Sequence, residues 1–211
     1  AETWWNPEGP MRPLHRMNPT RIHYIRDLAQ THLTPSSSSC SSSSSSSSSP
    51  SPSPSFSSSS SSPSPLSPHT LLDIGTGGGL IAEPMARLGA SVTAIDASAK
   101  NIEIAKLHAA QSGLAIDYRH TTAEALAATG AQYDIVLALE IIEHVADIPA
   151  FLDALYALVK PGGLLVLSTL NRTPKSYLFA IVGAEYVLRL LPRGTHQWRK
   201  FIKPSELAHQ L

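Results

Sequence analysis

The chain has 211 residues, of which 42% are hydrophobic and 15% charged, and its 16 basic and 16 acidic side chains give a formal net charge of zero. This balance argues against nucleic acid as the main partner, because phosphate binding needs a basic surplus or a concentrated basic patch. The single cysteine, Cys40, excludes an internal disulfide framework and a thiolate zinc cluster. The composition predicts one globular domain with appendages.

Residues 1–34 form an N-terminal arm. Ala1–Asn18 contains three prolines and two tryptophans without a helical period, which predicts irregular structure. Asn18 and Pro19 then favour a helix start, with the asparagine as cap and the proline in the first turn. The arm is either a strap that packs its tryptophans on the domain or a lid over a ligand, with Arg21 facing a ligand carboxylate.

A serine-rich tract, Pro35–Pro68, follows the arm and holds Phe56 and Leu66 as its only large apolar residues. This composition buries too little apolar surface to offset the entropy of ordering, so it predicts a disordered insertion. The domain tolerates such an insertion because the cost of loop closure grows only logarithmically with length. We assign the tract no chemistry.

The core, residues 69–170, alternates strand and helix patterns. Apolar runs predict strands at Leu71–Ile74, Val92–Ile95, Ile116–Arg119, Ile135–Leu139 and Leu164–Ser168. Helices are expected at Leu80–Leu88, Ser98–Gln111, Ala123–Ala128 and Asp147–Val159. Such βα repeats predict an α/β fold, a doubly wound, mostly parallel sheet with helices on both faces. Ligands bind such sheets at the carboxyl ends of the strands, so the chemistry should follow strands one, two and four.

The glycine-rich stretch Leu71–Leu80, LLDIGTGGGL, contains the first of these strand exits. Glycines such as Gly75 and Gly77 allow positive φ and a close approach of the backbone to a ligand, and a following helix N-terminus favours a polar or anionic group. Asp96 ends the next strand, where an acid accepts the two hydroxyls of a ribose. The glycine-rich stretch and Asp96 together indicate a nucleoside-type cofactor, but they do not distinguish NAD from S-adenosylmethionine.

Three further features favour S-adenosylmethionine. They are Asp73 inside the first strand, Glu124 at the third strand exit Thr121–Glu124, and the KPGG turn at Lys160–Gly163. Each alone is compatible with an ordinary strand-end acid or turn, but all three are less expected of an NAD-binding fold. Together they resemble a class I S-adenosylmethionine-dependent methyltransferase.

The fourth strand ends in ALEIIEHV, which places Glu140, Glu143 and His144 at the mouth of the pocket. Two carboxylates and an imidazole can supply three ligands to an octahedral divalent ion. A Mg²⁺ there would bind both oxygens of a catechol and lower the pKa of the phenol. Alternatively, His144 is the general base that removes the phenolic proton. A third interpretation is that Glu140 neighbours the cofactor while Glu143 and His144 cap a turn.

Residues 171–211 contain a strongly apolar stretch, Tyr177–Leu191, with basic residues on its flanks. The stretch is shorter than the ~18 residues that a membrane span needs. It is either a helix that covers the sheet or substrate pocket, or an interfacial helix at a membrane. Because five strands are visible, we expect C-terminal strands of a complete doubly wound sheet to be missing.

Several stretches together carry a resemblance to one family: the arm WWNPEGPMRPLHRMNPTRIHYI, the loop LLDIGTGGGLIAEPMARLGA, the segment NIEIAKLHAAQSGL, the exit ALEIIEHV and the C-terminal STLNRTPKSYLFAIVGAEYVLRLLPRGTHQWRKFIKPSEL. The chain resembles the ubiquinone biosynthesis O-methyltransferases, in eukaryotes the coenzyme Q hydroxylated-polyprenyl-benzoate O-methyltransferases. The resemblance implies methyl transfer from S-adenosylmethionine to catechol-type hydroxyls of polyprenylated intermediates, of the 3,4-dihydroxy-5-polyprenylbenzoate and demethylubiquinol types.

The resemblance also implies roles for individual residues. Carried over by position, the residues that contact the cofactor are Arg21, Gly75, Asp96 and Leu139, and those that bind Mg²⁺ are Glu140, Glu143 and His144. We add Asp73, Gly77 and Glu124 to the expected cofactor site and expect His144 and Glu143 to be catalytic. Thr76 stands where the family usually has cysteine, a small-for-small change that should leave cofactor binding intact.

The lipid substrate of the family implies peripheral membrane association and other ubiquinone-biosynthesis enzymes as partners. A serine tract suits a eukaryotic chain, which predicts the matrix side of the mitochondrial inner membrane; in a bacterium the expectation is the cytoplasmic face of the inner membrane. Two alternatives stay open. One is a membrane-associated, catalytically weak, truncated subunit of a quinone-biosynthesis complex, and the other is a methyltransferase for another small molecule.

Overall fold

A computed structural model describes residues 2–33, 64–169, 171–173 and 205–206. Its helices are α1 (Glu2–Trp5), α2 (Arg12–Leu33), α3 (Ala82–Arg87), α4 (Ala99–Gln111), α5 (Ala123–Ala127), the short 3₁₀ helix η1 (Ile142–His144) and α6 (Ile148–Leu158). Its strands are β1 (Thr70–Ile74), β2 (Ser91–Asp96), β3 (Asp117–His120), β4 (Tyr133–Leu139) and β5 (Val159–Ser168). The apolar stretch Tyr177–Leu191 and most of the serine tract lie outside the described residues.

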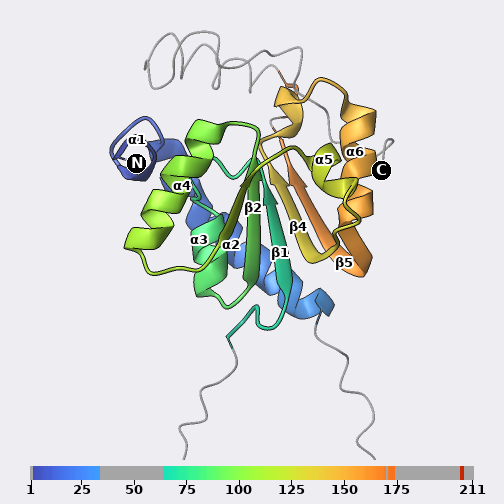
Figure 1. The fold of residues 1–211 in the computed structure, drawn as a ribbon, viewed down its shortest axis with the longest axis horizontal. Helices are drawn as coiled ribbons and strands as arrows, with labels where there is room; N and C mark the ends of the chain where they lie inside the picture. The colour runs from blue at the N-terminus through green and yellow to red at the C-terminus, as the bar shows by residue number, and fades with distance from the viewer. Residues whose placement is uncertain (1, 34–63, 170, 174–204, 207–211) are drawn as a thin grey trace, which may run out of the picture.

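The five strands form one parallel sheet with the order β3-β2-β1-β4-β5 (Figure 1). The chain winds outward from β1 to β3 and then returns to pair β4 on the other side of β1. The carboxyl ends of β1 and β4 therefore flank the topological switch point, where open α/β sheets bind ligands. This arrangement confirms the predicted doubly wound α/β fold.

The helices cover both faces of the sheet. Successive strand side chains point to opposite sides, so a continuous apolar strand presents apolar side chains on both faces. On one face, α2, α3 and α4 pack around strand residues such as Leu71 and Ile135. On the other face, α5 and α6 pack around Leu72 and Val136. All four strand residues have no measurable exposure. A strand that is buried on both faces needs the continuous apolar run seen in the sequence.

The caps of two core helices follow directly from the sequence. The Asp147 carboxylate accepts a hydrogen bond of 3.0 Å from the Ala150 N–H, and Pro149 lies in the first turn of α6, as predicted. Ser98 caps α4 in the same way through the Asn101 N–H. Pro84 lies in the first turn of α3, where a missing N–H is harmless.

The arm differs from the prediction, because it is helical where irregular structure was expected. Helix α2 begins at Arg12 rather than at Asn18, and Pro19 lies inside it. The ring Nε2 of His15 hydrogen-bonds the Trp4 carbonyl oxygen at 2.9 Å, which ties the first turns of α2 back to α1. Tertiary contacts of this kind offset the backbone hydrogen bond that Pro19 cannot donate.

The end of the serine tract also differs from the prediction. Residues 64–68 are part of the described structure, and the Leu66 side chain is completely buried in the core cluster beneath α3. Its N–H donates to the Leu88 carbonyl at 2.9 Å. Leu66, which was expected to belong to the disordered insertion, therefore joins the core.

Across the described residues, no helix is long and apolar enough to cross a bilayer.

Candidate functional site

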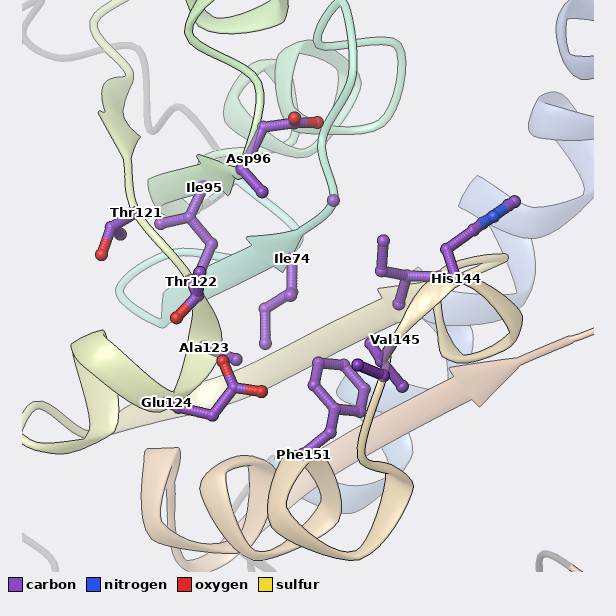
Figure 2. A pocket seen from close by; sticks show the side chains of 14 residues that line it. Ile74, Ile95, Asp96, Thr121, Thr122, Ala123, Glu124, His144, Val145 and Phe151 are labelled. Atoms are coloured by element: carbon purple, nitrogen blue, oxygen red, sulfur yellow. The ribbon is translucent and has the colours of Figure 1, made fainter.

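A cavity of about 320 Å³ opens at the carboxyl ends of β1, β2 and β3. Its lining comes from successive strand exits and includes Gly75, Asp96, Glu124, His144 and Phe151. Figure 2 shows the Glu124 carboxylate beside the Phe151 ring, with the Asp96 carboxylate at the opposite end of the cavity. We call this the first cavity. It offers acids at both ends and an apolar middle, which suits a nucleoside.

A second cavity, of about 150 Å³, lies between α2 and the glycine-rich loop. Its charged lining residues are Arg21, Asp73 and Glu140, and Leu139 adds an apolar wall. Gly75 lines both cavities, so they meet at the switch point of the sheet. The two cavities bring together all the predicted cofactor residues except Gly77.

The loop between β1 and α3 needs glycine for two different reasons. Gly75 has a φ of +74°, and a Cβ added there would lie 2.8 Å from the Ile141 Cδ1. Gly78 has no positive φ, but a Cβ there would lie 2.5 Å from the Cγ of Trp4. The backbone demands the first glycine, and the packing of the arm demands the second.

Asp96 holds this loop in place. One carboxylate oxygen, Oδ2, accepts from the Gly77 N–H at 2.9 Å. The other, Oδ1, accepts from the Ser98 N–H at 2.7 Å and from the Asn101 side-chain amide at 3.3 Å. Because each carboxylate oxygen can accept about two hydrogen bonds, Oδ2 keeps capacity for a ligand hydroxyl. Asp96 thus connects the glycine loop to the start of α4.

Asp73 is buried below the second cavity, with 3% of its surface exposed. Burial raises its pKa from 3.8 to about 6, and the nearby Asp96 charge adds to this rise. The Thr76 hydroxyl donates to Asp73 Oδ2 at 2.7 Å, which favours the ionised form and limits the shift. Thr76 therefore has a defined role at the position where cysteine was expected.

The arm contacts the glycine loop through Trp5, one of the two tryptophans that the strap interpretation packs on the domain, and through His108 and Glu83, which the sequence analysis did not single out. The Trp5 indole N–H donates to the Gly78 carbonyl at 2.9 Å, and the Trp5 ring stacks on His108 with ring centroids 3.6 Å apart. His108 Nδ1 in turn hydrogen-bonds the buried Glu83 carboxylate at 2.6 Å. A carboxylate at a core-facing position of α3 was the sequence signal that could have located this cluster.

Arg21 and Glu140 form an ion pair across the second cavity. Glu140 also accepts from the Ser168 hydroxyl at 3.0 Å, and its backbone has a φ of +54°, which is rare for a residue other than glycine. Such backbone strain concentrates at functional sites. The strained backbone and the guanidinium of Arg21 together fix the direction of this carboxylate.

Glu143 and His144 continue the same strand exit but point elsewhere. Glu143 is 5% exposed and accepts from the Thr169 hydroxyl at 3.0 Å. Burial raises its pKa, although the Thr169 hydrogen bond acts in the opposite direction. His144 is exposed on η1, and Figure 2 shows its imidazole turned away from Glu124 and Phe151.

The predicted metal site is not formed by this arrangement. In the part of the chain that the structure describes, no three His, Cys, Asp or Glu side chains are placed to hold one metal ion. Glu140 is paired with Arg21, Glu143 is buried against Thr169, and His144 lies on the rim. The tight 3₁₀ turn of η1 separates side chains that are adjacent in sequence, so a cluster of ligand types did not become a cluster in space.

Comparisons with known proteins agree with this geometry. A family model described as a methyltransferase domain matches residues 54–211. A ubiquinone biosynthesis O-methyltransferase from Brucella anthropi is 52% identical over the whole of this chain and 76% of its own length. One from Cereibacter sphaeroides is 53% identical over 98% of this chain and 74% of its own. The chain belongs to the ubiquinone biosynthesis O-methyltransferase family.

A member of this family is an S-adenosylmethionine-dependent O-methyltransferase. This class was predicted once Asp73, Glu124 and the KPGG turn were added to the glycine loop and Asp96. The plantazolicin methyltransferase BpumL, solved with a monoazolic desmethylPZN analogue and SAH, shares the fold with a TM-score of 0.56 at 21% identity, over 67% of this chain and 53% of its own. YcgJ from Bacillus subtilis gives 0.52 at 22% identity, over 67% and 59%. The compared family members come from bacteria, so they give no support to the predicted mitochondrial location.

Proposed function

We propose that this ubiquinone biosynthesis O-methyltransferase methylates a catechol-type hydroxyl on polyprenylated intermediates of the 3,4-dihydroxy-5-polyprenylbenzoate and demethylubiquinol types. The observation that carries the proposal is the pair of cavities that meet at Gly75, beside the carboxylates at the exit of β4. S-adenosylmethionine, when bound, supplies the electrophilic methyl group. The chain must bind this donor, orient the acceptor and take up one proton.

We assign the two ends of the donor to the two cavities. The first cavity offers Asp96 and Glu124 to hydroxyl and amine groups and the Phe151 ring to an apolar surface, as an adenosine requires. The second offers Arg21 to a carboxylate, as the methionine end requires. Gly75 lines both cavities, and its φ of +74° is one that residues with a side chain rarely adopt. The donor then crosses from one cavity to the other at Gly75.

We assign proton uptake to His144. It is the exposed imidazole on the rim of the first cavity, at the end of β4, and imidazole is the usual general base near neutral pH. Glu143 lies next to it and is held by Thr169, so we assign Glu143 a positioning role. Holding the acceptor oxygen near the methyl group, at about 3 Å, contributes much of the rate in such transfers.

In the described residues, Glu140, Glu143 and His144 are not grouped to hold one ion, so the roles above are assigned to side chains alone. The prediction of a magnesium requirement is still open to a direct measurement. Turnover in a chelator that falls to the blank rate and returns with added Mg²⁺ would show that the three side chains rearrange in the working enzyme. Unchanged turnover would agree with the geometry.

Membrane contact is part of the proposal because a polyprenyl tail partitions into a bilayer. Within this chain, the support comes from the sequence of Tyr177–Leu191, which lies outside the described residues. Flotation with liposomes is the measurement. Protein that stays at the bottom of the gradient would remove peripheral membrane association from the proposal.

The decisive experiment is an assay with S-adenosylmethionine and three acceptors: a short-chain polyprenylated catechol, a demethylubiquinol analogue and simple catechol. We expect methylated product with the first two and slower turnover with the third. His144→Gln should lower kcat by about 10²-fold or more, whereas the exposed Asp153→Asn in α6 serves as a control without effect. Equal turnover on all three acceptors would favour another small-molecule substrate. Donor binding without turnover would favour the catalytically weak subunit.

A further inference from the structure

One buried acceptor in the arm has no partner. The side chain of Asn18, in the second turn of α2, is part of a residue only 6% exposed. Its Oδ1 has no hydrogen-bond partner among the described residues. An unsatisfied buried polar atom costs about 1–3 kcal/mol, and native structures rarely tolerate one without a reason.

The surroundings of Asn18 indicate what would satisfy it. Asn18 lines the second cavity together with Arg21, Asp73 and Glu140. The ion pair between Arg21 and Glu140 uses one guanidinium nitrogen, Nη2, so other N–H groups of Arg21 can still bind a ligand carboxylate. Asp73 accepts from Thr76 through only one of its oxygens. Apart from Arg21, the remaining polar groups are acceptors, and acceptors in a cavity of net negative charge fit a cationic donor such as an ammonium group.

We propose that Asn18 is a binding residue for the methyl donor, and that its Oδ1 accepts a hydrogen bond from the α-ammonium group of the methionine end. This inference rests on the proposed function, which places that end in the second cavity. Asn18 and Arg21 are three residues apart on α2 and therefore lie on the same face of the helix. One turn of the arm thus recognises both charges of an amino acid, with Asn18 on the ammonium and Arg21 on the carboxylate.

The geometry also explains why the arm keeps a helix through Asn18–Pro19. A proline at position 19 disfavours the helical conformation of the residue before it and leaves one helical hydrogen bond unmade. The helix nevertheless continues, and it holds Asn18 and Arg21 in the same cavity. A break at this point would separate the two residues.

The test compares three ligands by calorimetry on the full chain. S-adenosylhomocysteine carries the ammonium and the carboxylate, its deaminated analogue lacks only the ammonium, and 5′-methylthioadenosine lacks the whole amino-acid end. For Asn18→Ala we expect at least a tenfold loss of affinity for S-adenosylhomocysteine and unchanged affinity for the other two. Arg21→Met should weaken the first two ligands and spare the third. Thr20→Ala, exposed on the same helix, should change none.

Two results would overturn the inference. One is an Asn18→Ala protein with the affinity of wild type for S-adenosylhomocysteine. The other is an equal loss for all three ligands, which would indicate a general defect of the arm. A wild-type chain that binds none of the ligands would instead refute the proposed function and this inference with it.

A conservative variant keeps the test decisive if Asn18→Ala does not fold. Asn18→Asp retains an acceptor and adds a negative charge beside the expected carboxylate. It should keep the affinity for S-adenosylhomocysteine and weaken the deaminated analogue, whose carboxylate has no ammonium to neutralise the new charge. A variant that binds both ligands as wild type does would contradict the assignment.

Discussion

At the scale of single residues, the protonation of Asp73 affects both the free energy of unfolding and the affinity for the proposed ligand. Its folded pKa of about 6 lies above the ordinary 3.8, because burial disfavours the charged form. The ionised carboxylate therefore lowers the free energy of unfolding, and the empty protein loses stability as pH rises from about 4 to about 6. The two pKa units correspond to roughly 3 kcal/mol as an upper figure.

The same titration should appear in donor binding. A cationic ligand in the second cavity favours ionised Asp73, so affinity for S-adenosylhomocysteine should increase as pH rises through about 6. The charged and titratable groups around Asp73 are Asp96, Tyr118, Arg21 and Glu140. Calorimetry between pH 5 and 8 measures the effect. A flat profile would show that Asp73 stays in one protonation state when the ligand binds.

Asp73→Asn should improve stability and impair binding at once. At pH 8 the amide removes a buried charge, so urea unfolding should give a higher free energy of unfolding than wild type. The same change should lower the affinity for S-adenosylhomocysteine and abolish its pH dependence near 6. Such opposed effects are common where a site tolerates strain for function. A variant that loses stability at pH 8 would refute the account of the raised pKa.

Gly78 offers a second test at this scale, because space alone restricts it. Gly78→Ala should displace Trp4, whose Cγ would be 2.5 Å from the new Cβ, and should lower donor affinity several-fold. Gly130→Ala is the matched control. Gly130 has a φ of +75° and open space around it, so the change should cost about 1–2 kcal/mol of stability without altering donor affinity. Equal donor affinity in the two variants would show that the position of Trp4 does not affect donor binding.

At the scale of elements, the attachment of the arm depends on Trp5. Trp5→Phe keeps the stacking on His108 and removes the hydrogen bond to Gly78, so we expect a loss of about 1 kcal/mol. Trp5→Ala removes both, and about 2–3 kcal/mol should be lost. Urea unfolding measures both values. Tyr24→Ala, at a position of α2 that is 61% exposed, should stay within about 0.5 kcal/mol of wild type. Equal free energies of unfolding in all three variants would mean that the arm is not attached through Trp5.

The sequence predicted the core elements well, because their signals are local. Continuous apolar runs and caps such as Asp147 placed the predicted strands and helices of residues 70–158 within two positions of their observed bounds. The fifth strand, β5, begins five residues before the prediction and includes the expected KPGG turn, and η1 was not predicted. The prediction for the arm was wrong because Asn18 and Pro19 carry a strong local signal for a helix start, which the contact between His15 and Trp4 overrides. The burial of Leu66 was missed for the opposite reason, because a single apolar residue forms no periodic pattern in the sequence.

The candidate site was predictable only in part. Strand ends converge in a parallel sheet, so the first cavity could be expected after Asp96 and Gly75. The directions of the side chains at the β4 exit depend on a positive φ at Glu140 and on η1, and neither can be predicted from residue type. The unpartnered Oδ1 of Asn18 was not predictable either, because it arises from long-range packing of the arm.

At the scale of the whole molecule, a polar network joins the strands at the end of the sheet opposite the cavities. Asp134 accepts from the Thr70 N–H and hydroxyl at 2.8 and 2.7 Å and from the Lys160 ammonium at 2.9 Å. These residues lie at the starts of β4, β1 and β5. Although desolvation acts to raise the pKa of Asp134, hydrogen bonds from Lys160 and Thr70 lower it to about 2.

This network should stabilise the fold without affecting function. A depressed pKa contributes stability above about pH 4, and that stability is lost as pH falls toward 2. Asp134→Asn should therefore lower the free energy of unfolding at pH 7 by about 1 kcal/mol, after allowance for a side chain that is 26% exposed, and by less at pH 3. Donor affinity should not change. A pH-independent loss would point to packing rather than charge.

The stacked pair of Trp5 and His108 also has an optical consequence. An indole whose ring lies 3.6 Å from an imidazole, and whose N–H is bound to a loop carbonyl, emits differently from one in water. Trp4 lies against the same loop at Gly77 and Gly78. Two native fluorophores therefore lie where the arm contacts the glycine loop. A change in emission when S-adenosylhomocysteine is added would report donor binding at this contact without a label.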